Sequence, residues 1–389
     1  MKFAHLSDCH IGGWREPELK KLNFLSFQKA IEDSLQEQVD FILLAGDLFD
    51  TALPHIDYIK ETTKLLRKVK DGGVPVYIIP GSHDFSYSGK TMLDVLEHAG
   101  LVTNVMRFDH EKRLQFFIDP KTGVKLTGMY GKKGGLEVYD YEKLDCSFLE
   151  REEGKKIFMF HTGLEEFKPA DMEKVSLQSV AMLPKNFDYY AGGHIHYRFI
   201  TSYDRGKIVY PGPTFPNNFK ELEDLECGSY VLVTDFVPIV KKLPLKEVIC
   251  ISLDVTGLSA QQASEAVSQR FFGKDIKDKI LLLRIYGELA FGKPSDITYP
   301  EFSETTLFLK HTAKLQAKIF EEMEVSSQEN VEAIEQEVIN QHLGQLPLPQ
   351  ESEIINHLLT TLEGEKMEGE KVADFEARIL SALLKQIQL

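Results

Sequence analysis

Carboxylates and imidazoles recur at the ends of short apolar runs in the first half of this 389-residue chain. Short apolar runs bounded by Gly, Pro and polar residues are typical of buried parallel strands. Ligands bind beyond the carboxyl ends of such strands, so we expect five strands to deliver these side chains to the same edge of one sheet. The motifs are Asp8-Cys9-His10, Gly46-Asp47-Leu48-Phe49-Asp50, Gly81-Ser82-His83-Asp84, Phe160-His161-Thr162-Gly163 and Gly193-His194-Ile195-His196.

These residue types suit metal ions. Carboxylate oxygens and imidazole nitrogens without sulfur fit manganese, iron or zinc, whereas a thiolate cage would indicate structural zinc. The alternation in Asp8-x-His10 and His194-x-His196 predicts that both side chains of each pair share one face of an extended segment. Six candidate ligands exceed the needs of one tetrahedral ion, so we expect two ions bridged by a shared carboxylate, which is a clamp for phosphoryl chemistry.

Each motif also has a plainer interpretation when it is taken alone. Asp8 could cap a helix, and His161 could be a core histidine with satisfied hydrogen bonds. The occurrence of all five motifs at strand ends, in this order, argues against scattered histidines and capping aspartates. Cys9 alternates with the ligands on its strand, so it is expected to point away from the metals into the core.

The motif series D-x-H, G-D-x-x-D, G-x-H-D, H and G-H-x-H resembles the calcineurin-like metallophosphoesterase superfamily over about the first 215 residues. More narrowly, the chain resembles the SbcD/Mre-eleven-type nuclease subunits of DNA double-strand-break repair. The resemblance implies an α/β fold, with a two-sheet β-sandwich flanked by helices, a small α+β capping domain and a helical C-terminal tail. Further support comes from Leu44 to Asp50 and from Val209-Tyr210-Pro211-Gly212-Pro213.

The resemblance also implies roles for individual residues. One divalent ion would take Asp8, His10 and His196, with Asp47 bridging to a second ion, and Mn2+ is the metal we expect in both sites. The second ion would take Asp47, His161, His194 and the side-chain oxygen of Ser82. His83 resembles the catalytic histidine that meets the leaving oxygen, and Asp50 the carboxylate that orients it. Asp84 is either an alternative partner of that histidine or a turn residue, and we favour the turn.

One position departs from the family pattern. Ser82 stands where the family usually has Asn, and its hydroxyl reaches one bond less far. Binding through a water would weaken the second metal site. A lost ligand can also produce an inactive relative, but all the other ligands are present, so we favour an active enzyme with altered metal affinity.

The layout predicts four regions. These are a metallophosphoesterase (nuclease) domain over 1–243, a capping domain that orients DNA over 244–300, a helical extension over 301–346 and a C-terminal helical hairpin over 347–389. Helices are predicted over 17–38, 57–70, 90–99, 259–272, 305–324, 330–343, 353–362 and 372–388. Strands 228–233 and 239–242 are expected to close the second sheet, 114–118 and 124–129 to form a hairpin, and 248–255 and 280–285 to lie in the capping domain.

Several residues are candidate DNA contacts. An exposed Trp14 beside Arg15 could stack on a base, although Trp14 could equally pack under its loop. Lys132 and Lys133 lie in a Gly-rich loop that could hold a phosphate or be an ordinary solvated turn, and Arg198 is a further candidate. The apolar face of the C-terminal hairpin could dock on its own protein or in a partner groove. The resemblance implies a Rad-fifty-type SMC-like ATPase as that partner, and a homodimer formed through helices.

Charge and composition limit the alternatives. Residues 301–389 hold 17 acidic and 7 basic side chains, which is most of the net charge of −15, so this tail is not the expected DNA-binding part. The chain has no long apolar run, no C-x-x-C spacing and no room for a signal peptide before its first ligand, which predicts a cytoplasmic, nucleoid-associated protein without a membrane partner. We expect a DNA exonuclease or endonuclease. The alternatives are a small-molecule or protein phosphoesterase and, because of Ser82, a catalytically weak scaffold.

Overall fold

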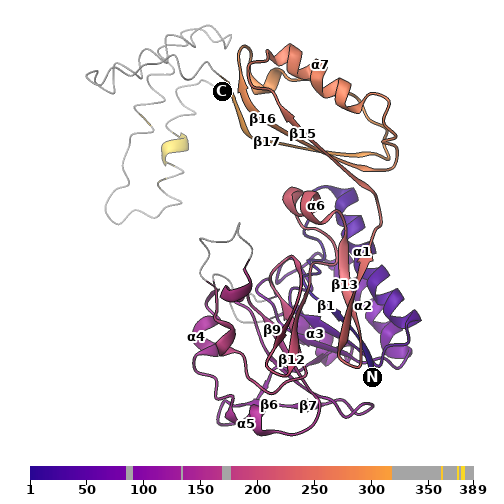
Figure 1. The fold of residues 1–389 in the computed structure, drawn as a ribbon, viewed down its shortest axis with the longest axis vertical. Helices are drawn as coiled ribbons and strands as arrows, with labels where there is room; N and C mark the ends of the chain where they lie inside the picture. The colour runs from indigo at the N-terminus through magenta and orange to yellow at the C-terminus, as the bar shows by residue number, and fades with distance from the viewer. Residues whose placement is uncertain are drawn as a thin grey trace. The chain divides into compact units, whose positions relative to one another are not determined.

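The computed structural model describes residues 1–84, 91–132, 135–168 and 177–317, together with Thr361, Phe375 and residues 378–381. The chain separates into two compact units, Met1–Gln316 and Ala317–Leu389. The first unit holds two large sheets and a smaller three-stranded sheet (Figure 1). In the second unit, Ala317 ends a strand, and the other described residues are helical.

The first large sheet holds three of the five predicted site strands. Its order is β14-β13-β1-β2-β3-β4, parallel from β1 to β4, with β13 antiparallel to β1. Strand β2 is buried along its whole length, as expected for a central parallel strand. The bounds are β1 (Lys2–Leu6), β2 (Phe41–Ala45), β3 (Val76–Ile79), β4 (Thr103–Asn104), β13 (Gly228–Thr234) and β14 (Val237–Leu243).

The second large sheet holds the other two site strands, β9 and β10. Its order is β11-β12-β10-β9-β8-β7, and β8, β9, β10 and β12 are parallel. Short strands β5 (Arg107–Phe108) and β6 (Leu114–Gln115) form a separate ribbon. The bounds are β7 (Phe117–Ile118), β8 (Lys125–Met129), β9 (Lys156–His161), β10 (Tyr189–Gly193), β11 (Arg198–Tyr203) and β12 (Gly206–Pro211).

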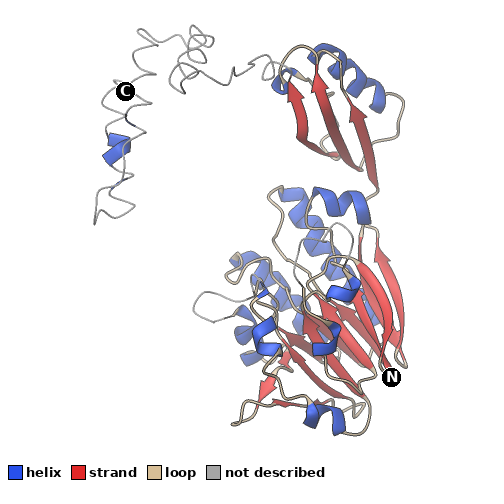
Figure 2. Cartoon of the chain, turned by 60° about the vertical axis from the view of Figure 1, so that its left-hand side comes forward, coloured by secondary structure: helices blue, strands red, loops and turns tan. Residues whose placement is uncertain are grey.

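Side-chain alternation along the strands produces the layers. In β2, Phe41 and Leu43 face the other sheet, where one buried cluster joins them to Met159 and Tyr189. Residues of the other parity, such as Leu44, pack under the helices on the outer face. The predicted helices are present as α1 (Pro17–Gln36), α2 (Ile56–Asp71) and α3 (Met92–His98), while α4 (Val138–Tyr141) and α5 (Ser147–Arg151) lie outside the second sheet (Figures 1 and 2).

The sandwich confirms the predicted fold class, but two details differ from expectation. The five site strands were predicted to lie in one sheet, whereas they come from two facing sheets. Strands β13 and β14 were expected to close the second sheet, yet they extend the first, because β13 returns antiparallel alongside β1 with Val231 opposite His5. The predicted hairpin is present as β7 and β8.

The smaller sheet lies where the sequence predicted a capping domain, and it is called the capping unit. It consists of β15 (Val248–Asp254), β16 (Ile280–Leu289) and β17 (Leu307–Ala317) in that order, with α7 (Ala260–Phe271) connecting the parallel pair β15 and β16. Helix α7 begins with the predicted capping box between Ser259 and Gln262. A further short helix, α6 (Phe219–Leu225), lies between β12 and β13 in the chain.

The helix predicted over 305–324 is wrong for the part that the structure describes. Residues 307–317 form strand β17, which adds a third strand to the capping sheet beyond residue 300. Leu307 and Leu309 pack in one apolar cluster and Phe308 in another, which is the period of a strand rather than of a helix. The helices predicted over 330–343, 353–362 and 372–388 lie outside the described residues except for Thr361, Phe375 and 378–381, which are helical. No helix in the described part of the chain is long and apolar enough to span a membrane.

Candidate metal centre

The candidate site forms where β1, β2 and β3 of one sheet and β9 and β10 of the other end together. The loops after β1 and β2 are joined by backbone hydrogen bonds from Asp8 N to Gly46 O (3.1 Å) and from His10 N to Asp47 O (3.0 Å). Alternation along an extended segment was expected to pair Asp8 with His10, but both have left-handed backbones. The positive φ angles are 51° at Asp8, 41° at His10, 52° at Asp47 and 86° at His194.

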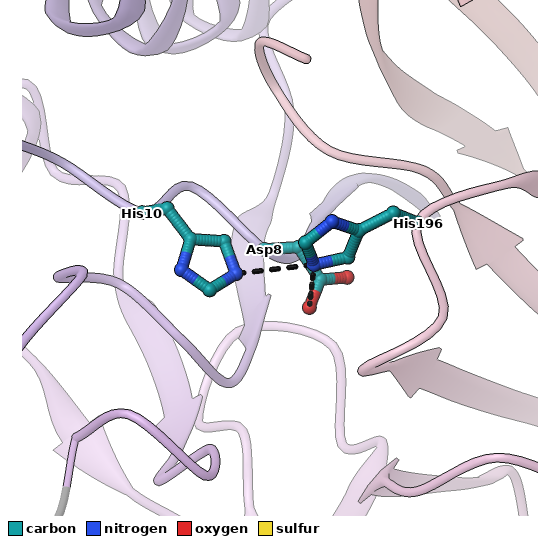
Figure 3. A group of neighbouring side chains, drawn as sticks. All are labelled: Asp8, His10 and His196. Atoms are coloured by element: carbon teal, nitrogen blue, oxygen red, sulfur yellow. Dashed lines mark hydrogen bonds and ion pairs between the residues drawn. The ribbon is translucent and has the colours of Figure 1, made fainter. Parts of the chain in front are cut away.

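Asp8, His10 and His196 form the first cluster of possible ligands, and their rings and carboxylate converge on one point (Figure 3). The Nε2 atoms of His10 and His196 are 3.1 Å apart, and His196 Nε2 is 3.7 Å from Asp8 Oδ1. Asp8 is completely buried, and its carboxylate accepts hydrogen bonds from Ser7 Oγ (2.6 Å) and His194 N (2.9 Å). This carboxylate is therefore fixed before any ion binds.

Asp47, His161 and His194 form the second cluster. His161 Nδ1 contacts the carbonyl oxygen of Ala45 at 2.8 Å, so Nδ1 is the atom that carries the proton in a neutral ring. Its Nε2 atom is buried, makes no hydrogen bond to any described residue and lies 3.1 Å from Asp47 Oδ2. In a metal-binding histidine, one ring nitrogen usually donates to a carbonyl or carboxylate and the other binds the ion. The hydrogen bond of Nδ1 to Ala45 leaves Nε2 for that role.

Asp47 connects the two clusters. Its Oδ2 atom lies 3.1 Å from His161 Nε2 and 3.6 Å from His10 Nε2, and Ser82 Oγ approaches the same oxygen at 3.3 Å. Its Oδ1 atom accepts a hydrogen bond from the backbone N–H of His83 at 2.7 Å. One carboxylate oxygen thus faces both histidine sets, which fits the expected bridging ligand.

Electrostatics in the metal-free cluster follow from burial and charge. Burial by itself would lower the pKa of His161, but the adjacent Asp47 carboxylate raises it to about 10. Burial likewise disfavours the charged form of His196, but its hydrogen bond to Glu221 and the charges of Asp8, Glu221 and Asp47 together raise its pKa to about 9. Burial and the neighbouring His161 lower the pKa of His194 to about 4. The protons that His161 and His196 hold beside these carboxylates could therefore be displaced by divalent cations.

His83 and Asp50 lie at the open side of the first cluster. The His83 side chain is 40% exposed, and its ring packs edge-on against His10 with centroids 4.7 Å apart. His83 Nδ1 contacts the backbone carbonyl of Asp50 at 2.6 Å, whereas the Asp50 carboxylate is 4.0 Å away and lies closer to His10 Nδ1, at 3.3 Å. The backbone carbonyl of Asp50, rather than the carboxylate expected from the sequence, is therefore the group that contacts His83, and the carboxylate lies closer to His10.

Asp84 joins two site loops and is more than a surface turn residue. It is buried, and its Oδ2 atom accepts hydrogen bonds from the backbone N–H groups of Asp47 (2.9 Å) and Gly81 (2.8 Å). Burial and the neighbouring Asp47 charge raise its pKa to about 7. The loop after β3 is thereby held against the loop after β2.

Glu221 was missed by sequence reasoning. It lies on α6, and its Oε1 atom contacts His196 Nδ1 at 2.9 Å, leaving Nε2 to face Asp8 and His10. A carboxylate behind a ligand histidine fixes the ring orientation and strengthens the ligand. No spacing rule connects the two residues, because a hairpin and a turn separate them in the chain.

Among the predicted DNA contacts that the structure describes, all but Arg15 have partners within the protein. Trp14 is 7% exposed and its Nε1 donates to Pro216 O at 2.8 Å, which confirms the packing alternative. Arg15 is exposed, and Lys132 pairs with Asp140 at 2.6 Å. Arg198 donates to Ser229 Oγ at 2.8 Å and to Leu225 O at 3.3 Å, so it holds a turn of the protein itself. Lys133 lies outside the described residues.

Residues 1–198 match the calcineurin-like phosphoesterase family, and the chain belongs to that family. The buried histidine and carboxylate clusters lie within or directly beside this matched segment. The chain is therefore a metallophosphoesterase whose candidate metal ligands are brought together by the fold.

Comparison with individual proteins gives a narrower similarity. The chain is 24% identical to the DNA double-strand break repair protein Mre11 of Archaeoglobus fulgidus over 317 residues, covering 73% of this chain and 68% of that protein. It is 28% identical to Mre11 of Methanococcus maripaludis over 242 residues (58% and 60%) and to the uncharacterized metallophosphoesterase YhaO of Bacillus subtilis over 238 residues (58% and 55%). The chain thus spans between about half and two thirds of these relatives. A dimetal phosphatase structure from Danio rerio aligns with a TM-score of 0.38 at 8% identity, covering 62% of this chain and 95% of that one.

Proposed function

We propose that this protein is a DNA nuclease that hydrolyses phosphodiester bonds at a two-metal centre. The observation that carries the proposal is that Asp47 Oδ2 lies between two histidine clusters, 3.1 Å from His161 and 3.6 Å from His10. Two ions sharing a carboxylate suit in-line displacement at phosphorus. The similarity to an Mre11 protein over 317 residues extends past the 198 residues of the family match, which favours DNA as the substrate.

The donor set fits divalent cations, and we propose Mn2+. Asp8, His10 and His196 would hold one ion, and His161, His194 and Ser82 the other, with Asp47 shared. When bound, such ions lower the pKa of a water molecule towards neutrality and offset charge on phosphoryl oxygens. The oxygen and nitrogen donors support this assignment, as does the buried His161 Nε2 atom, which lies 3.1 Å from Asp47 Oδ2.

We propose His83 as the group that serves the leaving oxygen. Its Nδ1 atom is held by the Asp50 carbonyl, so its Nε2 atom remains to donate a proton or to stabilise charge. Its partial exposure beside His10 places it where a substrate could reach it. Asp50 would position both rings, the backbone carbonyl holding His83 and the carboxylate facing His10.

We also propose the wider setting. The phosphoesterase domain would end near residue 243, and the capping domain, extended to β17, would orient DNA. The Mre11 relatives are named for double-strand-break repair, so we propose a role in that process in the cytoplasm, at the nucleoid, with an SMC-like ATPase bound by the C-terminal helices. Exposed Leu53, Ile56 and Val95 on and beside α2 and α3 support a homodimer.

Cleavage of linear duplex and single-stranded DNA with Mn2+ tests the proposal. The parent is expected to cut, His83→Ala to bind metal but lose cleavage, and Asp47→Ala to lose both, because Asp47 Oδ2 lies close to histidines of both clusters. Lys279→Met, which alters an ion pair within the capping domain, serves as a control and should cut like the parent. Equal cleavage by all four proteins would refute the assigned site.

Ser82 supports a second candidate, a DNA-processing scaffold with a weak second metal site. The Ser82 hydroxyl lies 3.3 Å from Asp47 Oδ2, in contact with another ligand. A scaffold would bind DNA without cutting it, and Ser82→Asn would restore cleavage. Hydrolysis of a chromogenic phosphodiester but not of DNA would instead indicate a small-molecule phosphoesterase.

A further inference from the structure

Helix α6 (Phe219–Leu225) contacts both the metal centre and the capping unit. Leu222 is completely buried and belongs to one apolar cluster with Trp14 and with Ile280 and Leu282 of β16. Two acidic residues of α6 make contacts in different directions. Glu221 contacts His196 of the metal cluster, and Glu223 contacts Arg284 of the capping sheet. A helix of seven residues therefore carries contacts in two directions.

Glu221 is fixed on the side that faces the metals. Its Oε1 atom contacts His196 Nδ1 at 2.9 Å and accepts from Asn218 Nδ2 at 2.6 Å, while Oε2 accepts from the backbone N–H of Asn217 at 2.7 Å. Both oxygens are thus held by hydrogen bonds, and the direction of the carboxylate depends on the position of α6. The His196 ring must follow that direction, because its other nitrogen belongs to the first ligand cluster.

The end of α6 is tied to the same segment a second time. Arg198, two residues after His196, donates from its guanidinium to the carbonyl oxygens of Leu225 and Cys227. Its Nε atom donates to Ser229 Oγ at 2.8 Å, which keeps the guanidinium in place. The loop that carries His196 is therefore attached to α6 by one carboxylate and one guanidinium.

On the other side, α6 is attached to the capping sheet by charge and by ring contacts. Glu223 receives two hydrogen bonds from Arg284 of β16, at 3.1 Å from Nε and 2.6 Å from the terminal nitrogen. The Arg284 guanidinium also lies 5.2 Å from the centre of the Phe219 ring, and His311 of β17 contacts that ring with centroids 5.4 Å apart. Two parallel hydrogen bonds from one guanidinium to one carboxylate fix the relative orientation of α6 and β16 better than a single exposed ion pair would.

We propose that Glu221 is a positioning residue for His196, and that α6 couples the placement of the capping unit to metal binding through the Glu223–Arg284 pair. A displacement of β16 would move α6, and with it the carboxylate behind His196. Coupling between two sites is reciprocal, so metal binding should in turn stabilise the contact between α6 and β16. The inference rests on the metal centre proposed above.

The test measures binding of Mn2+ alone, by loss of the free-ion signal in electron paramagnetic resonance, and uses no substrate. Glu221→Ala should weaken one of two sites by roughly 10- to 100-fold, the usual effect of removing such a partner. Glu221→Gln should recover part of the affinity, because an amide oxygen still accepts from His196. Arg284→Met should weaken the same site by roughly 2- to 30-fold, although it touches no ligand.

Exchanging the pair, Glu223→Arg with Arg284→Glu, should restore the affinity lost in Arg284→Met, which a general packing defect would not allow. Lys279→Met, in an ion pair confined to the capping unit, should bind as the parent does. Hydrogen exchange over residues 280–289 should slow when Mn2+ is added to the parent and respond less in Arg284→Met. If Arg284→Met and Glu221→Ala bind Mn2+ as the parent does, the coupling through α6 is refuted and the proposed metal centre is not. If the parent binds no Mn2+, both are refuted.

Discussion

Four of the candidate ligand residues have left-handed backbones. Asp8, His10, Asp47 and His194 have positive φ angles between 41° and 86°, a region that side chains other than glycine rarely adopt. Each such residue costs about 1–3 kcal/mol unless its surroundings impose the conformation. Here the surroundings are the paired loops and buried hydrogen bonds, such as that from His194 N to Asp8 Oδ1 (2.9 Å). The fold thus holds ligand positions that local sequence preferences would not produce.

Ser82→Asn should strengthen the second metal site. An asparagine oxygen reaches one bond further than the Ser82 hydroxyl, which now lies 3.3 Å from Asp47 Oδ2. We expect affinity for the second Mn2+ ion to rise by roughly tenfold, with the first site unchanged. Calorimetric titration of the metal-free protein measures both sites. Ser82→Ala is the matched control and should not gain affinity; an equal gain in both variants would contradict a ligand role at this position.

The stability of the metal-free protein should fall as the pH rises from 7 to 9. The pKa values of His161 (about 10) and His196 (about 9) lie above the unfolded value of about 6.5. Their contribution is therefore complete below the unfolded pKa and is lost as the pH rises through the folded values. Urea unfolding with a chelator would show this decline. Added Mn2+ should stabilise more at about pH 9 than at about pH 7, because the ion displaces these protons. A His161→Gln variant with an undiminished slope would contradict this origin.

The residues that the fold brings together as candidate ligands could be predicted from the sequence, but the groups that support them could not. Asp8, His10 and Asp47 stand in short motifs whose residue types indicate metal binding. Glu221 supports His196 only because α6 returns to the site, and no local pattern marks that return. Trp14 was similarly ambiguous, because its burial depends on Pro216 far along the chain.

At the scale of elements, the turn after β2 leaves no room for a side chain. Gly46 has φ +89°, and a Cβ there would lie 2.2 Å from His161 Nδ1. Gly46→Ala should therefore destabilise the fold by about 3 kcal/mol or more and displace His161 from the ligand cluster. Chemical unfolding and Mn2+ titration together measure both consequences.

Gly123 provides the matched control for that prediction. It has a similar backbone, φ +72°, in the hairpin between β7 and β8, but a Cβ there would meet no atom within 4 Å. Gly123→Ala should cost only the backbone strain of about 1 kcal/mol and leave Mn2+ affinity unchanged. Equal destabilisation by the two variants would show that the contact with His161 is unimportant.

Elements with a strong local pattern could be predicted, and those defined by distant pairing could not. Helix α7 begins at Ser259 because of its capping box, which is visible in the sequence. Strand β17 forms because Leu307 and Phe308 are taken up by different apolar clusters, which requires the rest of the capping sheet. The placement of β13 likewise depends on distant pairing, because β13 forms hydrogen bonds with β1, which lies more than 200 residues earlier in the chain.

At the scale of the whole molecule, the net charge of −15 bears on how DNA could bind. Contacts to phosphates come from basic groups, and their affinity falls steeply with salt. Most of the charge excess lies after residue 300 in the sequence, so the part of the chain that supplies the candidate ligands is much less acidic than the chain as a whole. Several basic residues are already engaged within the protein, including Arg198 and Lys132.

The proposed homodimer can be tested through an exposed apolar surface at the start of α2. Leu53 and Ile56 are 79% and 68% exposed, which is unusual for two large apolar residues so close in the chain. A symmetric dimer would bury both copies of this surface against each other. Leu53→Glu with Ile56→Glu should therefore convert a dimer, of about twice the 44.3 kDa chain mass, into a monomer in sedimentation experiments.

Phe272→Glu is the matched control, because it replaces a residue of the capping unit that is 90% exposed, and it should leave the mass unchanged. A parent that sediments as a monomer at all concentrations would exclude the dimer, and a dimer that survives the double substitution would place its interface elsewhere.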